Sequence, residues 1–362
     1  MARASEGGPV PPPGPDDDAL DRVLLAHADV VPEWPEAGAN HYPMAAEALE
    51  SLGFEEAIEP AWSTSGAERY RAELPRLSPL EAEAPLASTA LGARARYGDW
   101  LDWFRTRIAT DGWKRVVADT VPSLAPGLVG GAFHGLIRTG HAVRAVARRE
   151  TPARRGALAA GLAYWAATYA ELPAGPSPAP ATLGARDLAE LEHPFLDSTE
   201  EVGFFDVVPR LLSRPLAPGV TPDSEVRATD RDPPEELDRI VHAASLAFLE
   251  MLALEQERIW LLHCITAPGC VDLLLPHVAE ADAEELVDYT RQAVVAMYAA
   301  FGAPFTPQEH LREAPGPWSE LLPTAARTGS VHTIKLAEAL FRFGKGPANL
   351  ERSVLAAWLD WK

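Results

Sequence analysis

The sequence has little of what several classes of protein require. It contains two cysteines among 362 residues, Cys264 and Cys270, which are too few for a disulfide framework and lack the paired spacing of a zinc site. Basic residues are also scarce, since 32 Lys and Arg stand against 52 Asp and Glu and give a formal net charge of −20. Because phosphate binding needs clustered positive charge, nucleic acid is not an expected partner.

Common nucleotide-binding and hydrolase motifs are missing as well. There is no P-loop, no Gly-x-Ser-x-Gly and no His-Glu-x-x-His. Gly127, Gly130 and Gly131 lack the preceding strand and the spacing of a dinucleotide fingerprint. A ferritin-like di-iron site needs two Glu-x-x-His motifs, and only Glu190 to His193 fits that pattern. A nicotinamide cofactor such as NADPH would therefore have to bind without a recognised motif.

The chain also lacks the apolar segments that target a protein to a membrane. Its N-terminus has no apolar h-region, and no apolar run reaches the length that spans a bilayer. We expect a cytoplasmic protein with no membrane partner. Residues 1–18, which run from Gly- and Pro-rich to acidic, are predicted to be a disordered tail. Residues 19–362 are predicted to form a single helical domain.

Apolar residues at helical spacing dominate the rest of the sequence, whereas alternating strand-like runs are few. The expected helical segments are 21–28, 43–52, 92–108, 132–149, 154–172, 235–265, 283–301 and 331–343. Gly53 is placed as a helix stop. Two proline-rich connections, 173–181 and 213–234, separate some of these segments, and the second reads as a long surface excursion or lid. We predict an all-α, multi-helix bundle with long proline-rich connections.

Four histidines lie in apolar helical or pre-helical settings far apart in the sequence: His41, His134, His263 and His332. A soluble protein seldom buries so many imidazoles without using them. Imidazole is the commonest protein ligand for a transition metal and moves protons near neutral pH. The sequence therefore favours a metal-dependent redox site assembled from several helices. His27 lies next to residues that are typical of loops, so its side chain is expected to be exposed.

Each of these histidines also has a structural explanation. His134, Arg138 and His141 share one helical face at about 100° per residue, and a buried His–Arg hydrogen-bond network would explain them equally well. His263 is expected near the C-terminal end of the segment 235–265, where it could complement the helix dipole. Asn40 could orient the side chain of His41, which precedes a proline.

Lys335 stands three residues after His332, so both side chains could reach one centre from a single helix. Its neighbours are apolar, which leaves several explanations open. The ammonium could pair with Glu338 or snorkel to the surface. Alternatively, buried Lys335 could be neutral and basic, or carboxylated to supply an oxygen ligand. A separate basic cluster is expected to be the solvated end of a helix: Arg144, Arg148, Arg149, Arg154 and Arg155.

Four segments occurring in order resemble the questin oxidase-like family: Asn40 to Gly53, Gly131 to Val143, Leu261 to Thr266 and His332 to Leu336. The resemblance spans roughly 40–345. It implies oxidative chemistry on aromatic polyketides, such as O₂-dependent opening of an anthraquinone-type ring. Family members of fungal type tend to carry a second histidine where this chain has Arg138, which leaves open whether His141 is a ligand.

Together these observations predict a mononuclear metal oxygenase, with Fe(II) as the expected metal, that acts on an aromatic small molecule and O₂. The expected ligands are His41, His134, His263 and His332, with Lys335 as a further ligand or a base. Three residues are expected to orient ligands or hold substrate oxygens: Arg138, His141 and Thr266. Aromatic walls could come from Trp100, Trp103, Tyr164, Trp165 and Trp260. A metal-free histidine-base oxygenase and a non-catalytic binding protein for apolar aromatics are the alternatives; the sequence does not predict an oligomeric state.

Overall fold

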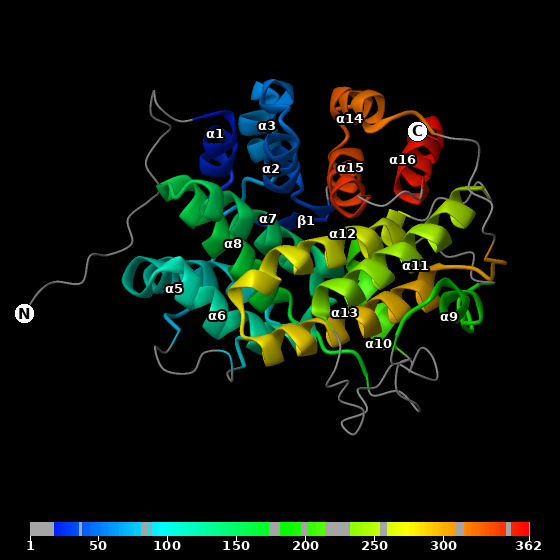
Figure 1. The fold of residues 1–362 in the computed structure, drawn as a ribbon. Helices are drawn as coiled ribbons and strands as arrows, with labels where there is room; N and C mark the ends of the chain where they lie inside the picture. The colour runs from blue at the N-terminus through cyan, green and yellow to red at the C-terminus, as the bar shows by residue number, and fades with distance from the viewer. Residues whose placement is uncertain are drawn as a thin grey trace, which may run out of the picture.

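The computed structural model describes residues 18–35, 38–80, 86, 89–173, 182–196, 202–213, 232–253, 259–307, 315–344 and 349–361. Most of this part of the chain is α-helix, which confirms the predicted all-α class (Figure 1). Its one sheet pairs β1 (Glu33–Trp34) with β2 (Gly38–Ala39) in antiparallel register. The helices that build the core and the site are α1 (Ala19–Ala26), α2 (Tyr42–Leu52), α5 (Tyr97–Asp111), α6 (Trp113–Leu124), α7 (His134–Arg148), α8 (Pro152–Thr168), α11 (Pro233–Ala253), α12 (Ile259–Leu274), α13 (Glu280–Phe301), α14 (Trp318–Arg327), α15 (Val331–Phe343) and α16 (Leu350–Trp361).

Local signals placed several helix ends correctly. α2 ends at Leu52, and Gly53 follows in the left-handed conformation at φ 80°, which glycine adopts without steric cost. α15 has the predicted bounds 331–343, and the Ser330 hydroxyl accepts a hydrogen bond from the backbone N–H of Thr333. Asp18, the last residue of the predicted tail, is the N-cap of α1.

The prediction of one long helix over 235–265 was wrong. The segment forms two helices, α11 and α12, that pack against each other, and His263 is the fifth residue of α12. The histidine therefore lies near a helix N-terminus, and a role at a C-terminal dipole is excluded. No Gly or Pro marks the boundary, whereas the proline that is present, Pro268, lies inside α12. Tertiary packing rather than local propensity sets this break.

Three predictions fall wholly or mostly outside the described residues. These are the N-terminal tail, the proline-rich connection at 173–181 and the excursion at 213–234. The described chain continues on either side of each internal segment, with α8 before the first and α10 (Val207–Leu212) before the second.

α12 lies at the centre of the molecule, between α15 and the pair α11 and α13 (Figure 1). Together with the turn after it, Ile259–His277 is long and apolar enough to cross a membrane by length and composition. The sequence-based statement that no run reaches this length was therefore wrong. A core helix surrounded by other helices passes the same test, and α12 contacts α7, α11, α13 and α15.

Glycines let α7 approach its neighbours closely. A Cβ atom on Gly140 would lie 2.6 Å from Cβ of Cys270 on α12, and a Cβ on Gly135 would lie 2.4 Å from Cα of Trp165 on α8. Any larger residue would push these backbones apart, because protein interiors are close-packed. The contact between Gly140 and Cys270 brings α7 close to α12, and these two helices carry His134 and His263.

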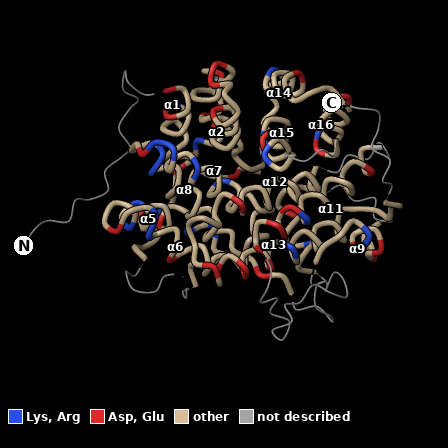
Figure 2. Tube along the Cα trace, in the orientation of Figure 1, with Lys and Arg blue, Asp and Glu red and all other residues tan. Residues whose placement is uncertain are grey.

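The expected solvated basic cluster divides into exposed and buried members. Figure 2 shows the basic segment where α7 turns into α8. Arg148, Arg149 and Arg155 are exposed there, but Arg154 is buried and its Nε donates to Asp21 Oδ1 at 2.9 Å. Arg144 also points inward. The prediction was wrong for these two side chains because buried carboxylates from α1 and α2 compensate their charge.

Candidate functional site

Four helices bring the four histidines into one cluster. His41 is the N-cap of α2, His134 is the first residue of α7, and His332 is the second residue of α15. Nε2 of His134 lies 2.7 Å from Nε2 of His41 and 3.1 Å from Nε2 of His263. The ring of His332 completes the cluster, with its centroid 4.4 Å from that of His41.

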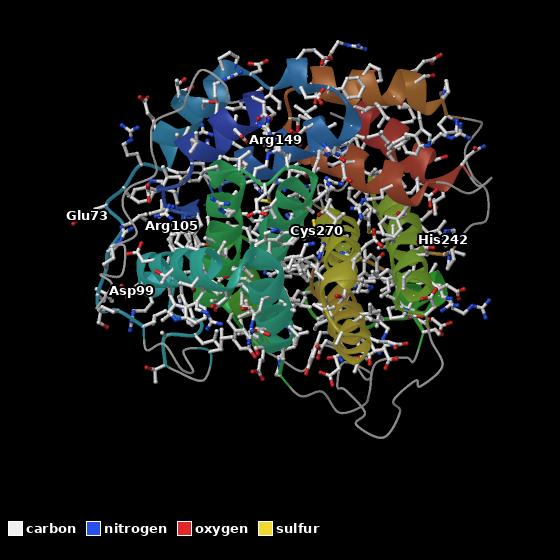
Figure 3. The ribbon with its side chains drawn as sticks, turned by 60° about the vertical axis from the view of Figure 1, so that its left-hand side comes forward. Glu73, Asp99, Arg105, Arg149, His242 and Cys270 are labelled. Carbon is white, nitrogen blue, oxygen red and sulfur yellow. The ribbon has the colours of Figure 1, made fainter. Side chains whose placement is uncertain are left out.

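The same helices meet again about two turns farther along. There His141 of α7 contacts Glu47 of α2, at 2.6 Å between Nδ1 and Oε2, and Gly140 packs against Cys270 of α12. Arg144 links the Glu47 carboxylate to Glu338 of α15. Cys270 marks this level near the centre of Figure 3.

Each of the four helices runs from the histidine level toward this ionic level. Their N-terminal ends converge on the imidazoles. A helix N-terminus carries about half a positive elementary charge and unpaired N–H groups. The cluster is therefore a favourable place for an anionic ligand atom.

A strained turn fixes the imidazole of His134. Gly131, Ala132 and Phe133, which directly precede it, have φ of 55°, 52° and 68°. Two of them are not glycine, and such conformations are costly and concentrate at functional sites. The turn places Gly131 O 2.7 Å from Nδ1 of His134. Nδ1 must then carry the proton, which leaves the Nε2 lone pair directed into the cluster.

The environment keeps three of these imidazoles neutral. Burial lowers the pKa of His41 and His134 well below 6.5, and the neighbouring Lys335 and imidazoles lower it further. Burial and Lys335 lower the pKa of His263 to about 3. A neutral imidazole is the form that binds a metal ion.

The spacing of the nitrogens fits a single metal ion. One ligand nitrogen each from His41, His263 and His332 lies within 4.8 Å of the others, and this is the only such group of three or more His, Cys, Asp or Glu in the described part of the chain. Nitrogens bound at about 2.0–2.1 Å to one ion lie about 2.9 Å apart when they are at right angles. The contacts of His134 with His41 and His263 bracket that separation.

Lys335 lies beside the cluster on α15, one turn after His332. Its side chain is buried, and Nζ has no hydrogen-bond partner among the described residues. Burial lowers the pKa of Lys335 to about 7, although Cys270 opposes the change. Glu338 pairs with Arg144 and Arg342 instead, so neither the predicted Lys335–Glu338 ion pair nor the surface snorkelling is observed.

Comparison with known protein families gives one clear result. The model of the questin oxidase-like family matches residues 39–340. The chain belongs to the questin oxidase-like family. Membership implies an oxidoreductase, and the family description suggests an oxidase of aromatic polyketides. The match covers the four histidines and Lys335. Among curated proteins, none matches this chain.

Other residues predicted for this site lie around the cluster rather than in it. His141 is at the ionic level, where burial lowers its pKa but Cys270 and Glu47 raise it more strongly, to about 9. Arg138 is buried one turn before, and its Nη2 donates to His27 O at 3.5 Å. The Thr266 hydroxyl donates to Leu262 O within α12, which places it in a backbone contact rather than in the cluster.

The structure corrects the expectations for His27 and Asn40. His27 is fully buried, whereas the sequence suggested an exposed side chain. Its Nε2 lies 2.7 Å from Trp62 O, and its Nδ1 accepts a hydrogen bond from Asn40 Nδ2 at 2.8 Å. Asn40 thus anchors the backbone before His41 to α1, and does not bind the His41 imidazole. Burial lowers the pKa of His27 to about 4.

The aromatic wall differs from the predicted one. The Trp260 ring is stacked at 6.3 Å from His263, as expected of a wall residue. Trp100, Trp103 and Trp165 pack elsewhere in the core on α5 and α8. The sequence reasoning missed Phe204, whose ring lies 5.4 Å from His134 and 6.4 Å from Trp260. Nothing in the local sequence around Phe204 points to this contact.

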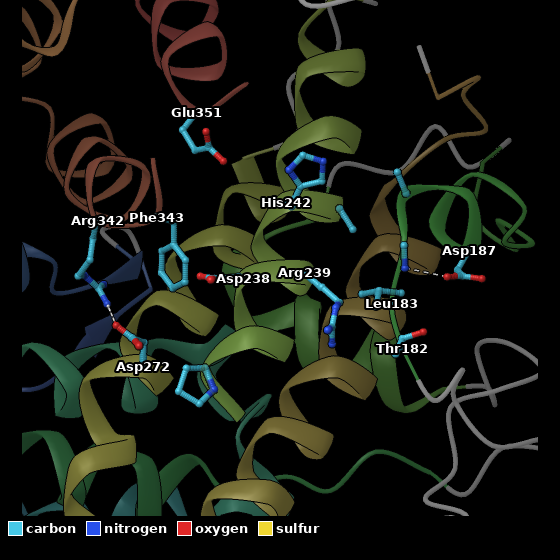
Figure 4. A pocket seen from close by; sticks show the side chains of 14 residues that line it. Thr182, Leu183, Asp187, Asp238, Arg239, His242, Asp272, Arg342, Phe343 and Glu351 are labelled. Carbon is cyan, nitrogen blue, oxygen red and sulfur yellow. Dashed lines mark hydrogen bonds and ion pairs between the residues drawn. The ribbon is translucent and has the colours of Figure 1, made fainter. Parts of the chain in front are cut away.

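The largest cavity described is separate from the histidine cluster. It has a volume of about 830 Å³ and lies between α9 (Ala185–Ala189), α11 and the ends of α12 and α15 (Figure 4). Asp272 and Arg342 form an ion pair there at 2.7 Å. They lie nine and ten residues beyond His263 and His332, or roughly 15 Å along each helix. Its charged lining makes it a poor match for an apolar aromatic molecule.

The described residues also contain no βαβ unit, since their one sheet is the two-stranded β1–β2 pair. A dinucleotide site of the usual α/β type is therefore absent from this part of the chain.

Proposed function

We propose that His41, His134, His263 and His332 bind one metal ion, and that the enzyme is an iron-dependent oxygenase of aromatic polyketide phenols. The observation that carries the proposal is the convergence of four imidazoles, three of them with strongly lowered pKa values, at the N-terminal ends of four helices. Histidine-rich sites suit iron among several first-row metals. A bound iron would supply the redox centre that allows electrons from the aromatic ring to reach O₂.

The protein's own groups would prepare the substrate for this chemistry. The converging helix N-termini would stabilise the negative charge of a deprotonated phenol. Lys335 would accept the phenolic proton, since a pKa of about 7 leaves a large neutral fraction at neutral pH. Phe204 and Trp260 would exclude water from one side of the cluster.

A second candidate keeps these roles but needs no metal. The 2.7 Å contact between Nε2 of His41 and Nε2 of His134 is also the length of a hydrogen bond. In this alternative, Lys335 or a histidine deprotonates a hydroquinone, which then reacts directly with O₂. The non-catalytic binding protein considered from the sequence is disfavoured by membership of an oxidase family.

Elemental analysis and O₂ uptake test the proposal. The protein should be purified without a metal-affinity tag and reconstituted anaerobically with Fe²⁺. We expect about one iron per chain and O₂ consumption with an anthraquinol that depends on this iron. Turnover by metal-free protein would support the second candidate, and binding without any turnover would overturn both.

We expect Lys335→Met to lower kcat by about 10²–10⁴-fold, the usual contribution of a positioned general base. In the wild type, activity should fall with decreasing pH near or below pH 7, because the ammonium form cannot accept a proton and a bound cation would lower the pKa further. The variant should lose this acid limb. Lys114→Met, on an exposed position of α6, is the control. A wild-type acid limb in Lys335→Met would contradict the assignment.

A further inference from the structure

A second, smaller cavity lies next to the histidine cluster. It has a volume of about 280 Å³ and is enclosed by β1, the start of α5, the end of α8 and Phe205. Trp34, Tyr97, Tyr164 and Phe205 contribute aromatic rings to its lining. Ligand pockets span about 300–1,000 Å³, so this cavity is suited to a molecule of roughly two or three fused rings.

The mostly apolar lining also contains a few polar groups. Tyr164 donates from its hydroxyl to Glu33 Oε2 at 2.8 Å, and Arg94 binds the other oxygen of the same carboxylate. The Glu33 side chain is only 8% exposed. A carboxylate offers about four acceptor positions, so Glu33 can accept one more hydrogen bond. Burial and Glu33 raise the pKa of Tyr164 well above 10, which keeps its proton in place.

Tyr97 contributes its ring to the lining but not its hydroxyl. Its side chain is buried, and the hydroxyl oxygen is covered by protein without a hydrogen-bond partner among the described residues. Burial raises the pKa of Tyr97, so the hydroxyl stays protonated.

Short contacts join this cavity to the histidine cluster. The Tyr164 hydroxyl lies 3.4 Å from the position of a Cβ on Gly131, the residue whose carbonyl orients His134. Phe205 in the cavity contacts Phe204 at 5.0 Å between ring centroids, and Phe204 contacts His134. The strand β1 also pairs with β2, which leads directly to His41. One layer of residues thus separates the cavity from the imidazoles.

We propose that this cavity binds the non-reacting rings of a planar hydroxylated aromatic substrate. Glu33 accepts the phenolic hydroxyl, the ring of Tyr97 faces the bound rings, and the Phe204–Phe205 pair directs the reacting ring toward the histidines. This assignment rests on the proposed function for the choice of substrate, but not for the existence of a binding site. The groups required are an acceptor and a wall of aromatic rings, as the lining provides.

Equilibrium dialysis of a coloured dihydroxyanthraquinone against metal-free protein in EDTA tests the proposal. Ala95→Phe at the exposed rim and Ala167→Phe on the buried wall should fill the cavity and raise Kd at least about tenfold, or about 1.4 kcal/mol. Ala185→Phe, which lines the 830 Å³ cavity, is the matched control and should leave Kd unchanged. Unchanged binding in Ala95→Phe, with wild-type circular dichroism, would overturn the proposal even if Ala167→Phe fails to fold.

A further variant tests the polar contact. Glu33→Gln keeps the shape of the lining, so it should weaken binding of the dihydroxyanthraquinone by about 3–10-fold, as expected for loss of one hydrogen bond. For Glu33→Gln, unsubstituted anthraquinone should bind with wild-type affinity because it lacks the hydroxyl. An equal loss for both probes would show that Glu33 acts on the fold alone and would overturn its assigned role.

The results separate this inference from the proposed function. Binding that is lost in the filled variants, together with no O₂ uptake under any metal condition, would retain the cavity and refute the oxygenase. Iron-dependent turnover of an anthraquinol at a wild-type KM in Ala95→Phe would retain the oxygenase and refute the cavity. Both measurements use the full chain.

Discussion

Replacement of His263 by alanine is expected to abolish metal binding while leaving the helical circular dichroism largely intact. His263 contributes one of the nitrogens grouped within 4.8 Å, and its imidazole is buried and neutral. Loss of one ligand from a small set leaves coordination incomplete, and second-sphere groups alone do not hold a metal. His332→Ala is expected to have the same effect. Elemental analysis after anaerobic reconstitution with Fe²⁺ measures both.

His242→Ala is the matched control, because His242 is an exposed histidine on α11 that lines the separate large cavity (Figure 3). It should keep the metal content of the wild type. Stoichiometric metal retained in both His263→Ala and His332→Ala would refute the ligand assignment. If metal is lost only together with the circular dichroism, His263→Gln provides a variant of similar volume.

The four clustered histidines could be predicted because each stands out locally. An imidazole among apolar residues at helical spacing is unusual, and burying it without a partner is costly. The bounds of α15 were predictable for a similar reason, since Ser330 is a good N-cap and the apolar spacing persists to Phe343. Such information is contained in a window of one or two helical turns.

The arrangement that gives the site its electrostatic character could not be predicted from such windows. The break between α11 and α12 occurs without a breaking residue, and it moves His263 from a helix end to a helix start. The convergence of the N-terminal ends of α2, α7, α12 and α15 depends on contacts between residues separated by 90 or more positions, such as His41 with His134. Phe204 and His27 join the site by the same long-range packing.

The two levels of this four-helix group have opposite electrostatic characters. The histidine level contains imidazoles and helix N-termini, with no carboxylate among the grouped metal-binding side chains of the described residues. The ionic level holds Glu47 and Glu338 between Arg144, Arg342 and protonated His141. Balanced charge at the ionic level fixes the spacing of the helices without placing an anion among the imidazoles. We therefore expect that a substitution at the ionic level will first lower the free energy of unfolding.

Glu47→Gln tests this expectation and should lower the free energy of unfolding toward the lower end of about 3–5 kcal/mol, the usual cost of breaking a buried ion pair. Glu47 is 1% exposed and binds both His141 and Arg144, so the substitution leaves two buried cations short of a counter-charge. Arg144 keeps Glu338, which limits the loss. Denaturant unfolding in EDTA measures the effect without a contribution from bound metal. Glu150→Gln removes an exposed ion pair with Arg155 and should change stability by less than about 0.5 kcal/mol.

The difference between wild type and Glu47→Gln should also depend on pH. Burial raises the pKa of Glu47, but Arg144 and His141 lower it below 4.5 overall; its contribution is therefore complete above pH 4.5 and is lost as pH falls through the lower folded value. The pKa of His141 is raised from 6.5 to about 9, so its contribution is complete below pH 6.5 and is lost as pH rises through 9. The stability difference should be largest between pH 4.5 and 6.5, vanish in acid and shrink only in part in alkali, where Arg144 remains charged. A difference that stays constant from acid to alkali would show that Glu47 stabilises this level by packing rather than by charge.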